Sequence, residues 1–359
     1  MFVFIFILIA LLASGFTVAK KDEFFIDYMS PQNTAAINGI FSILIFFSHA
    51  SQYFKLAGVF DKPYLSLRSY IGQTVVVTYL LFSGFGLMES IKKKKTDYVK
   101  SIPTQRFFKL WYKFAILIVA FAALRYYVGV KMTVSQVLLS FIGYKSVGNS
   151  NWYMLVTFAL YLIIFVAFMI FRRNNWLGVT TVFALTTGFV FFLAWLENPE
   201  HYYNTIYCLP LGMLFSLVKP YWDKLLMKND AVWFTAFGII GALFFYFADR
   251  KALSVVHYSF FSVFFGLLVI VLMMKTNIKS PVLDWFGRHI FSFFMLQRIP
   301  MILFKFLKVT KRPYVFMILC FIATVVLSVL FDKLMEKTDA LIFKPKKKKE
   351  VLEAAEAKA

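Results

Sequence analysis

Long apolar runs recur from one end of this chain to the other, and they restrict the fold more than any other feature. Each has about 16–23 residues, enough for a helix to cross a hydrocarbon layer of about 30 Å with some tilt or local thinning. Charged residues make up only 16% of the 359 residues, against about 25% in soluble domains. We therefore predict an all-α, polytopic transmembrane helix bundle of about 10–11 spans. The predicted spans are 3–18, 35–54, 70–90, 106–128, 152–171, 177–195, 203–218, 231–248, 254–274, 288–307 and 314–335.

The charges between the runs predict the orientation of the bundle. Basic residues follow every odd-numbered span, and the positive-inside rule places such loops in the cytoplasm. We expect a multi-pass protein of the cell membrane with its N-terminus outside and its C-terminus cytoplasmic. One loop departs from this rule, because Lys308, Lys311 and Arg312 would lie outside. The cytoplasmic set comprises Lys20 and Lys21, 92–95 with Lys100, Arg172 and Arg173, Lys219 with Lys224 and Lys228, Lys275 and Lys279, and the lysine-rich tail.

The chain divides into an N-terminal membrane anchor span (1–19), a transmembrane domain (20–337) and a basic cytoplasmic tail (338–359). A cleaved signal ending near Val18 and Ala19 stays open for the first segment. The apolar stretch 134–144 is too short to cross and is predicted to form a half-helix or interfacial segment on the outer face. The lysine run 346–349 suits anionic membrane lipids.

The net charge of +21 follows from this loop pattern and does not indicate nucleic acid. No basic stretch carries the interleaved stacking aromatics of a single-strand reader. The two cysteines, Cys208 and Cys320, both fall in predicted spans and are expected to be small buried residues. Their spacing predicts no metal site, and no metal is expected.

A polar stripe runs along the second span. Asn38, Ser42, His49 and Gln52 are spaced four, seven and three residues apart. Residues eleven apart lie about 20° apart around a helix and about 16 Å apart along it. Asn38 is therefore near the cytoplasmic end of one face and His49 in its outer half. Because a polar stripe facing lipid is costly, we predict that this one faces the bundle interior.

His49 has two interpretations. An isolated intramembrane histidine is most often a structural group bonded to a neighbouring helix. The stripe, and the scarcity of other ionisable groups within the spans, favour a functional group instead. A neutral imidazole accepts a proton from a hydroxyl, which is the role of a general base.

Five short motifs occur in the order and spacing of one membrane protein family. Residues 35 to about 335 resemble the membrane acyltransferase-3 family, whose first signature is a basic residue, ten others and a histidine. The matching segments are 38–49, the Ser-Gly-Phe at 83–85, the Arg-x-x-Lys at 106–109, the Asn-Trp-Tyr at 151–153 and the late segment 287–297.

The resemblance implies an all-helical bundle that transfers an acyl group, usually acetyl, from cytoplasmic acyl-CoA to a hydroxyl. The acceptor would be a cell-envelope glycan or lipid-linked saccharide. Acetyl-CoA is the donor expected by resemblance, with succinyl as an alternative acyl group. Direct transfer and an acyl-enzyme intermediate both stay open.

Two positions depart from the family pattern. The basic residue of the first signature is Asn38 here, and the late histidine is Gln297. The neighbouring Ser and Tyr positions are Ile290 and Phe294. Arg298 lies beside Gln297 within a predicted span, where an arginine needs a partner or a polar cavity. We hypothesise that Arg298 supplies the positive charge missing at Asn38.

Donor-binding residues are expected at the cytoplasmic side. Arg106, Lys109 and Lys113 share one helical face, and such a basic stripe suits the phosphates of coenzyme A. Ordinary flanking charge is the alternative interpretation. Asn38 joins the donor site by resemblance. Ser83, Gly84 and Phe85 offer a close approach for the pantetheine arm, with helix packing as the alternative for the glycine.

Catalytic and acceptor-binding residues are expected toward the outside. His49 would be the base, and Gln297, Arg298 and Asn151 are candidate donors to the oxyanion that forms on the attacked carbonyl. Asn151, Trp152 and Tyr153 are predicted to bind the acceptor, with the two aromatic rings stacking on a sugar. The interfacial aromatic belt is the alternative for those rings.

Two other function classes stay open. A glycan or lipid transporter or flippase is disfavoured because Glu89, Asp284, Asp332 and Glu336 all fall near cytoplasmic ends, which leaves a proton relay without members. A catalytically impaired relative acting as an envelope-assembly partner is favoured by the departures at Asn38 and Gln297.

Overall fold

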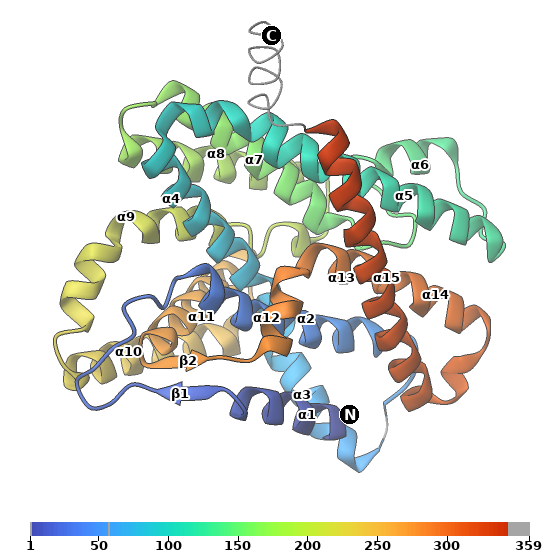
Figure 1. The fold of residues 1–359 in the computed structure, drawn as a ribbon, viewed down its shortest axis with the longest axis horizontal. Coiled ribbons are helices and arrows are strands. Elements are labelled where there is room, and N and C mark those ends of the chain that lie inside the picture. The colour runs from blue at the N-terminus through green and yellow to red at the C-terminus, as the bar shows by residue number, and fades with distance from the viewer. Residues whose placement is uncertain (1, 57, 344–359) are drawn as a thin grey trace, which may run out of the picture.

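The computed structural model describes residues 2–56 and 58–343, and within them it shows a helix bundle with one two-stranded sheet (Figure 1). The chain is 79% helical, which confirms the predicted all-α polytopic fold. The lysine run 346–349 and the rest of 344–359 lie outside the described residues. The main elements are α1 (Phe2–Ala13), β1 (Phe16–Val18), α2 (Pro31–Ala50), α3 (Lys62–Ile71), α4 (Val77–Ile102), α5 (Lys109–Tyr127), α6 (Val134–Ser140), α7 (Trp152–Ile170), α8 (Asn175–Trp195), α9 (Cys208–Leu226), α10 (Asp230–Arg250), α11 (Val255–Lys275), β2 (Thr276–Ile278), α12 (Pro281–Arg288), α13 (Ile290–Leu296), α14 (Arg298–Phe306) and α15 (Pro313–Ile342).

Seven helical stretches among the described residues are long and apolar enough to cross a membrane. They cover eight of the eleven predicted spans, since 70–90 and 106–128 fall within the single stretch Val59–Tyr127. The predicted helix 3–18 is wrong in extent, because α1 has only 12 residues and the chain then forms β1. The span 203–218 is shifted, because α9 begins at Cys208 and runs to Leu226.

The predicted span 288–307 is divided into α13 and α14. The first of these helices ends at Leu296 and the second begins at Arg298. Pro300 has no N–H to donate to the carbonyl of Leu296 four residues earlier, so an unbroken α-helix would lose a hydrogen bond there and clash with the proline ring. The break turns Gln297 and Arg298 into helix-terminal residues.

The loops predicted to share the cytoplasmic side are in mutual contact. Strands β1 and β2 pair antiparallel and join the loops after the first and ninth predicted spans. Lys275 Nζ donates to the carbonyl oxygens of Lys20 (3.1 Å) and Glu23 (2.8 Å), and it forms an ion pair with Asp230 after the seventh span.

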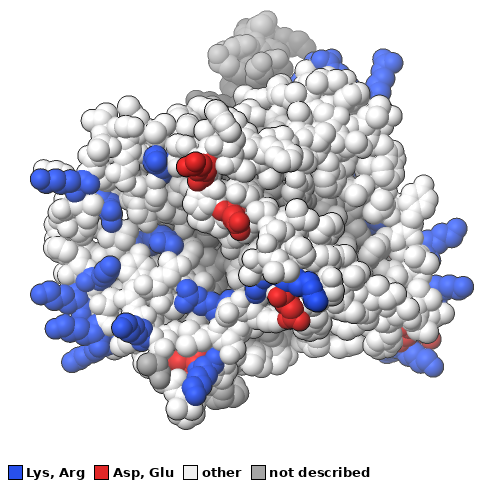
Figure 2. Space-filling view, turned by 180° about the vertical axis from the view of Figure 1, so that it is seen from behind, with Lys and Arg blue, Asp and Glu red and all other residues white. Residues whose placement is uncertain are grey.

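The loops predicted to share the outer side also contact one another. Gln73 Nε2 donates to the carbonyl oxygen of His201 (3.1 Å), which joins the loops after the second and sixth predicted spans. The hydroxyl of Tyr314 lies 3.2 Å from Asp61 Oδ1 and ties the loop after the tenth span to the same group. Both groupings agree with the sidedness that the loop charges predict. Figure 2 shows Lys and Arg side chains outnumbering Asp and Glu on one face, with broad uncharged areas between them.

Helix α2 lies in the middle of the bundle, where it packs very closely against α12 (Figure 1). A Cβ atom on Gly39 would lie 1.9 Å from the carbonyl oxygen of Leu283, and one on Gly287 would lie 1.8 Å from that of Ala35. Only glycines permit this backbone-to-backbone contact, which accounts for the glycine of the late motif.

Cys208 and Cys320 are both free and buried, as predicted. The segment 134–144 contains the seven-residue helix α6, which agrees with a helix too short to cross, and its place on the outer face stays a prediction.

Candidate active site

A cavity of about 480 Å³ lies at the C-terminal end of α2 and is here called the outer cavity. Its walls come from the end of α2, the start of α14, the turn before α4 and the loop that precedes α7. The residues that line it include His49, Gln52, Arg68, Ser150, Trp152, His201 and Arg298.

His49 occupies the last turn of α2 and is half-buried. Its ring centroid lies 5.9 Å from that of Phe294. The Nδ1 atom is buried and has no hydrogen-bond partner among the described residues. The imidazole is therefore held in place by packing at the edge of the cavity.

The other two predicted catalytic residues lie close to His49. Arg298 lines the same cavity, where its Nε donates to Ser150 Oγ (3.1 Å) and its Nη2 to Gln52 Oε1 (3.2 Å). Gln297 is fully buried and near enough to His49 to interact with its ring. Its Nε2 donates to the carbonyl oxygen of Phe294 (2.8 Å), and its Oε1 has no partner. The structure thus brings His49, Gln297 and Arg298 together.

A second cavity of about 480 Å³, the inner cavity, lies beside the N-terminal half of α2. Its lining residues come from α2, α4, α7, α12 and α13, and they include Asn38, Ser83, Tyr153, Thr157, Arg288 and Phe294. The side-chain oxygen of Asn38 is buried without a partner.

Phe294 lines both cavities and so forms part of the wall between them. Its ring makes an edge contact with Tyr153 at 5.6 Å, and Tyr153 in turn contacts Tyr79 at 6.5 Å. Of these three rings, Phe294 lines both cavities, and Tyr153 and Tyr79 line the inner cavity beside it.

The polar stripe on α2 faces the bundle interior, as predicted. Asn38 and Ser42 are buried, and Ser42 Oγ lies 2.8 Å from the hydroxyl of Tyr79. Asn38 opens to the inner cavity and His49 to the outer cavity. Arg298 and Asn38 line different cavities, which contradicts the hypothesis that Arg298 replaces the missing charge at Asn38. The basic residue that shares a cavity with Asn38 is Arg288.

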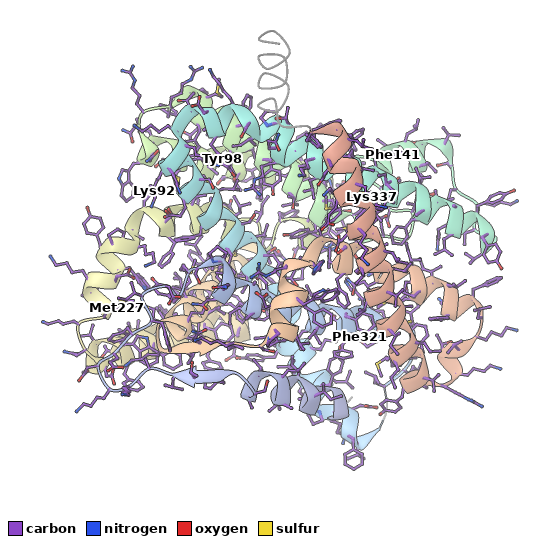
Figure 3. The ribbon with its side chains drawn as sticks, viewed as in Figure 1. Lys92, Tyr98, Phe141, Met227, Phe321 and Lys337 are labelled. Atoms are coloured by element: carbon purple, nitrogen blue, oxygen red, sulfur yellow. The ribbon has the colours of Figure 1, made fainter. Side chains whose placement is uncertain are left out.

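The predicted basic stripe on α5 is largely neutralised by a carboxylate from the end of α15. Lys109 and Lys113 lie 3.0 Å and 2.8 Å from Asp339 Oδ2. Arg106 is exposed on a π-helical turn, and its Nε donates to the hydroxyl of Tyr98 on α4 (3.0 Å; Tyr98 is labelled in Figure 3). These three residues do not line the inner cavity, so of the stripe only Arg106 is left without a carboxylate among the described residues.

Ser83, Gly84 and Phe85 divide between two roles. Ser83 lines the inner cavity. A Cβ on Gly84 would lie 1.9 Å from the carbonyl oxygen of Leu209, and Phe85 contacts Phe215 at 6.0 Å. Gly84 and Phe85 therefore pack α4 against α9, which is the alternative noted for the glycine.

The predicted acceptor-binding residues also separate. Asn151 lines the outer cavity, but its Nδ2 is used by the carbonyl oxygen of Gly143 and the hydroxyl of Tyr202, both at 2.8 Å. Trp152 lines the outer cavity and Tyr153 the inner one. Only Trp152 is thus a candidate platform for a ligand on the outer side.

Sequence reasoning missed Arg68, Asn149 and Tyr258, which complete the outer cavity. Arg68 lies on α3, a short helix outside the predicted spans. The signal that was available is an arginine placed just before an apolar run, although the same loop also carries Lys55, Asp61 and Lys62. Nothing in the local sequence of Asn149 or Tyr258 points to this cavity.

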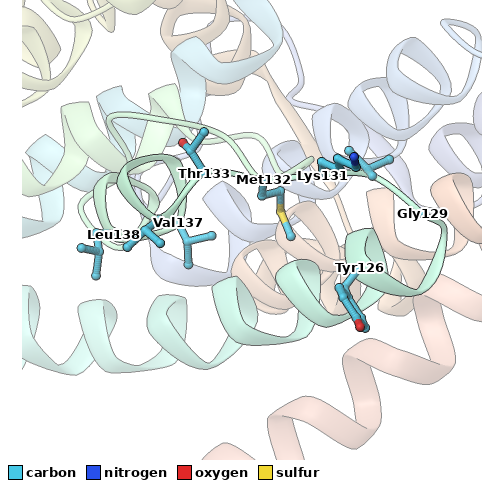
Figure 4. Close-up of a pocket in the computed structure, with 9 residues that line it drawn as sticks. Tyr126, Gly129, Lys131, Met132, Thr133, Val137 and Leu138 are labelled. Atoms are coloured by element: carbon cyan, nitrogen blue, oxygen red, sulfur yellow. The ribbon is translucent and has the colours of Figure 1, made fainter.

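Two histidines lie away from both cavities. His257 Nδ1 lies 2.8 Å from Ser254 Oγ at the start of α11, and His289 Nδ1 lies 2.5 Å from Asp332 Oδ2. No group of three metal-ligating side chains occurs among residues 2–56 and 58–343. A further hollow of about 630 Å³ lies between the end of α5 and α6 (Figure 4) and contains none of the predicted site residues.

Comparison with known proteins places these features in a family. The family model described as an acyltransferase domain matches residues 35–333. No curated protein and no solved structure matches the chain. The matched region begins within α2 and ends within α15, so it contains both cavities. This chain belongs to the acyltransferase-3 family and is a membrane acyltransferase.

Proposed function

We propose that the protein moves an acetyl or similar acyl group from cytoplasmic acyl-CoA to a hydroxyl of a cell-envelope glycan or lipid-linked sugar. The observation that carries this proposal is the pair of cavities of about 480 Å³ along α2, which share Phe294. A donor in the inner cavity and an acceptor in the outer cavity would meet at that wall, so the acyl group crosses while coenzyme A stays inside.

Charge supports the donor assignment to the inner cavity. Arg288 lines this cavity and forms an ion pair with Asp284, and Arg106 lies in the π-helical turn just before α5, the helix that contributes Leu110. Both residues belong to the side that the loop charges assign to the cytoplasm. Guanidinium groups suit the phosphates of coenzyme A, and Asn38 and Ser83 offer polar contacts to the pantetheine arm deeper in the cavity.

The chemistry then follows from His49. A ring nitrogen of its imidazole accepts the proton of the acceptor hydroxyl as the hydroxyl oxygen attacks the thioester carbonyl carbon. The new C–O bond replaces the C–S bond, and the coenzyme A thiolate leaves toward the inner cavity. Gln297, which lies beside His49, is the candidate donor to the oxygen that becomes negative in this step, through the second hydrogen of its Nε2. Gln297 provides hydrogen bonds where the family pattern has a histidine.

The test uses purified protein in liposomes with labelled acetyl-CoA and candidate glycans. His49→Ala is expected to lower transfer by about 10²–10⁴-fold, the usual contribution of a general base. His257→Ala is the matched control, because that histidine lies outside both cavities, and it is expected to keep wild-type activity. Undiminished transfer by His49→Ala would remove His49 from the mechanism. Absence of transfer by the wild type to any acceptor would favour a non-catalytic relative or a transporter.

A further inference from the structure

The outer cavity is strongly one-sided in charge. Its described lining contains two arginines, Arg68 and Arg298, and no aspartate or glutamate. The inner cavity, by comparison, has one basic residue, Arg288, which forms an ion pair with Asp284 at 2.7 Å.

Both arginines of the outer cavity contact neutral acceptors only. Arg298 donates to Ser150 and Gln52, and Arg68 Nη1 donates to Ser51 Oγ (3.0 Å). Neither guanidinium has a carboxylate within ion-pair distance in the part of the chain that the structure describes. Two positive charges therefore enter the cavity without a counter-ion.

Two other shielded cations in the bundle are compensated. Lys113 and Lys219, each with a side chain only 19% exposed, contact Asp339 and Asp223 at 2.8 Å and 2.5 Å. Arg125 and Lys251 are half-buried and have no carboxylate within ion-pair distance among the described residues, so one unpaired cation does not by itself indicate a ligand. The outer cavity brings two such cations, Arg68 and Arg298, to one hollow, where an anionic ligand would compensate both.

A third donor in the same cavity lacks an acceptor. Asn149 is 4% exposed, and its Nδ2 has no hydrogen-bond partner. Its Oδ1 accepts from the backbone N–H of Val147 (3.1 Å), which fixes the amide orientation. A buried N–H without an acceptor is costly, so the ligand is expected to bring oxygen acceptors as well as negative charge.

The loop that departs from the positive-inside rule adds charge to the same side. It follows α14, whose first residue is Arg298, and Lys308, Lys311 and Arg312 are all exposed there. Figure 2 shows Lys and Arg side chains gathered at the edge that α14 occupies in Figure 1. Such a field attracts an anionic ligand toward the cavity mouth.

We propose that the acceptor of this enzyme carries an oxyanion, a phosphate or a carboxylate, close to the hydroxyl that is acylated. Arg298 and Arg68 bind that oxyanion, Asn149 donates to it, and its neighbouring hydroxyl then lies toward His49. This inference rests on the proposed function, since it names the substrate class of the same site. The planar fork of arginine matches the oxygens of both groups.

The experiment compares acceptors that differ only in the anion. Glycerol 3-phosphate against glycerol, and glucuronate against glucose, are offered to the protein in zwitterionic liposomes with labelled acetyl-CoA. The wild type is expected to favour the anionic member in kcat/KM by roughly 10- to 100-fold. Arg298→Gln and Arg68→Gln should each lose most of that preference through a higher KM for the anionic acceptor. Arg298→Lys should restore part of it, and Arg250→Gln, outside the cavity, should leave it unchanged.

A binding arm separates this inference from the proposed function. Thermal unfolding of the protein in detergent is measured with the same four compounds and no acyl-CoA. Higher unfolding midpoints with the anionic compounds in the wild type, lost in Arg298→Gln and Arg68→Gln, support the anion site even if no acyl transfer is found. Equal midpoints together with equal kcat/KM values overturn it.

Two further outcomes overturn the inference by assigning the arginines another role. If Arg298→Gln lowers transfer to charged and neutral acceptors equally, the guanidinium acts on the reacting carbonyl oxygen. If phosphatidylglycerol in the liposomes raises transfer to neutral acceptors and no acceptor preference exists, the oxyanion belongs to a lipid headgroup.

Discussion

The contact between α2 and α12 provides a direct test of how closely the two cavities must be aligned. In Gly287→Ala, the added Cβ would lie 1.8 Å from the carbonyl oxygen of Ala35, whereas ordinary contacts begin at 3.4 Å. The shortfall, 3.4 Å minus 1.8 Å, is about 1.6 Å. Because the opposing atom belongs to a backbone, it cannot rotate away as a side chain would, and the two helices must separate.

The expected loss of stability follows from two opposing effects. Overpacking a well-packed contact costs about 1–3 kcal/mol, while replacing glycine by alanine within a helix returns up to about 1 kcal/mol. We expect a net loss of up to about 3 kcal/mol. The same separation moves Arg288 and Phe294 relative to α2, and a misplacement of about 1 Å can lower a rate by about 10²-fold.

The assay measures both the thermal unfolding midpoint in detergent and the rate of acyl transfer in liposomes. Gly241→Ala on α10 is the matched control, since no atom lies within 4 Å of the position that its new Cβ would take; its midpoint should be equal to or slightly above that of the wild type. Should Gly287→Ala match Gly241→Ala in both midpoint and rate, the close crossing would not be what aligns the cavities.

Two further predictions concern the wall and the outer loop. Phe294→Ala should open the wall between the cavities, so that acyl-CoA hydrolysis rises while transfer to the acceptor falls. Hydrolysis is measured as the free coenzyme A released in the absence of acceptor. An unchanged rate of hydrolysis would show that the wall lies elsewhere. Burial lowers the pKa of His201 below its ordinary value of 6.5. Above pH 6.5, His201 is neutral in both the folded and the unfolded chain. As the pH falls below 6.5, the unfolded chain binds the proton first, and the free energy of unfolding declines. His201→Gln should therefore flatten the fall in unfolding midpoint between about pH 6.5 and pH 5, and an identical profile for both proteins would contradict the reasoning.

Much of the fold could be predicted from the sequence because the membrane imposes it. Apolar runs of spanning length must form helices whose backbone groups bond internally, and eight of the predicted spans lie in helices that are long and apolar enough to cross. The position of His49 on an inward face followed from helical spacing alone. The family also followed from the sequence, since its motifs are local and ordered.

The errors occurred where a local rule was overridden. The residues 3–18 form a short helix and a strand because Phe16–Val18 pairs with Thr276–Ile278, a partner some 260 residues away. The span 288–307 was taken as continuous although Pro300 signals the break after Leu296.

Three features could thus be predicted before the structure: a membrane helix bundle, the acyltransferase-3 family and a histidine on an inward polar face. Each depends on hydropathy, helical periodicity or motif order, which are properties of neighbouring residues. The distribution of the candidate residues among ion pairs, helix contacts and the two cavities depends on the tertiary structure. It paired Lys109 and Lys113 with Asp339, packed Gly84 against α9, and gave Asn38 and His49 separate cavities. It also left Arg68 and Arg298 together without a carboxylate in the described part of the chain. Contacts between distant segments depend on how helices cross, and no local pattern encodes that.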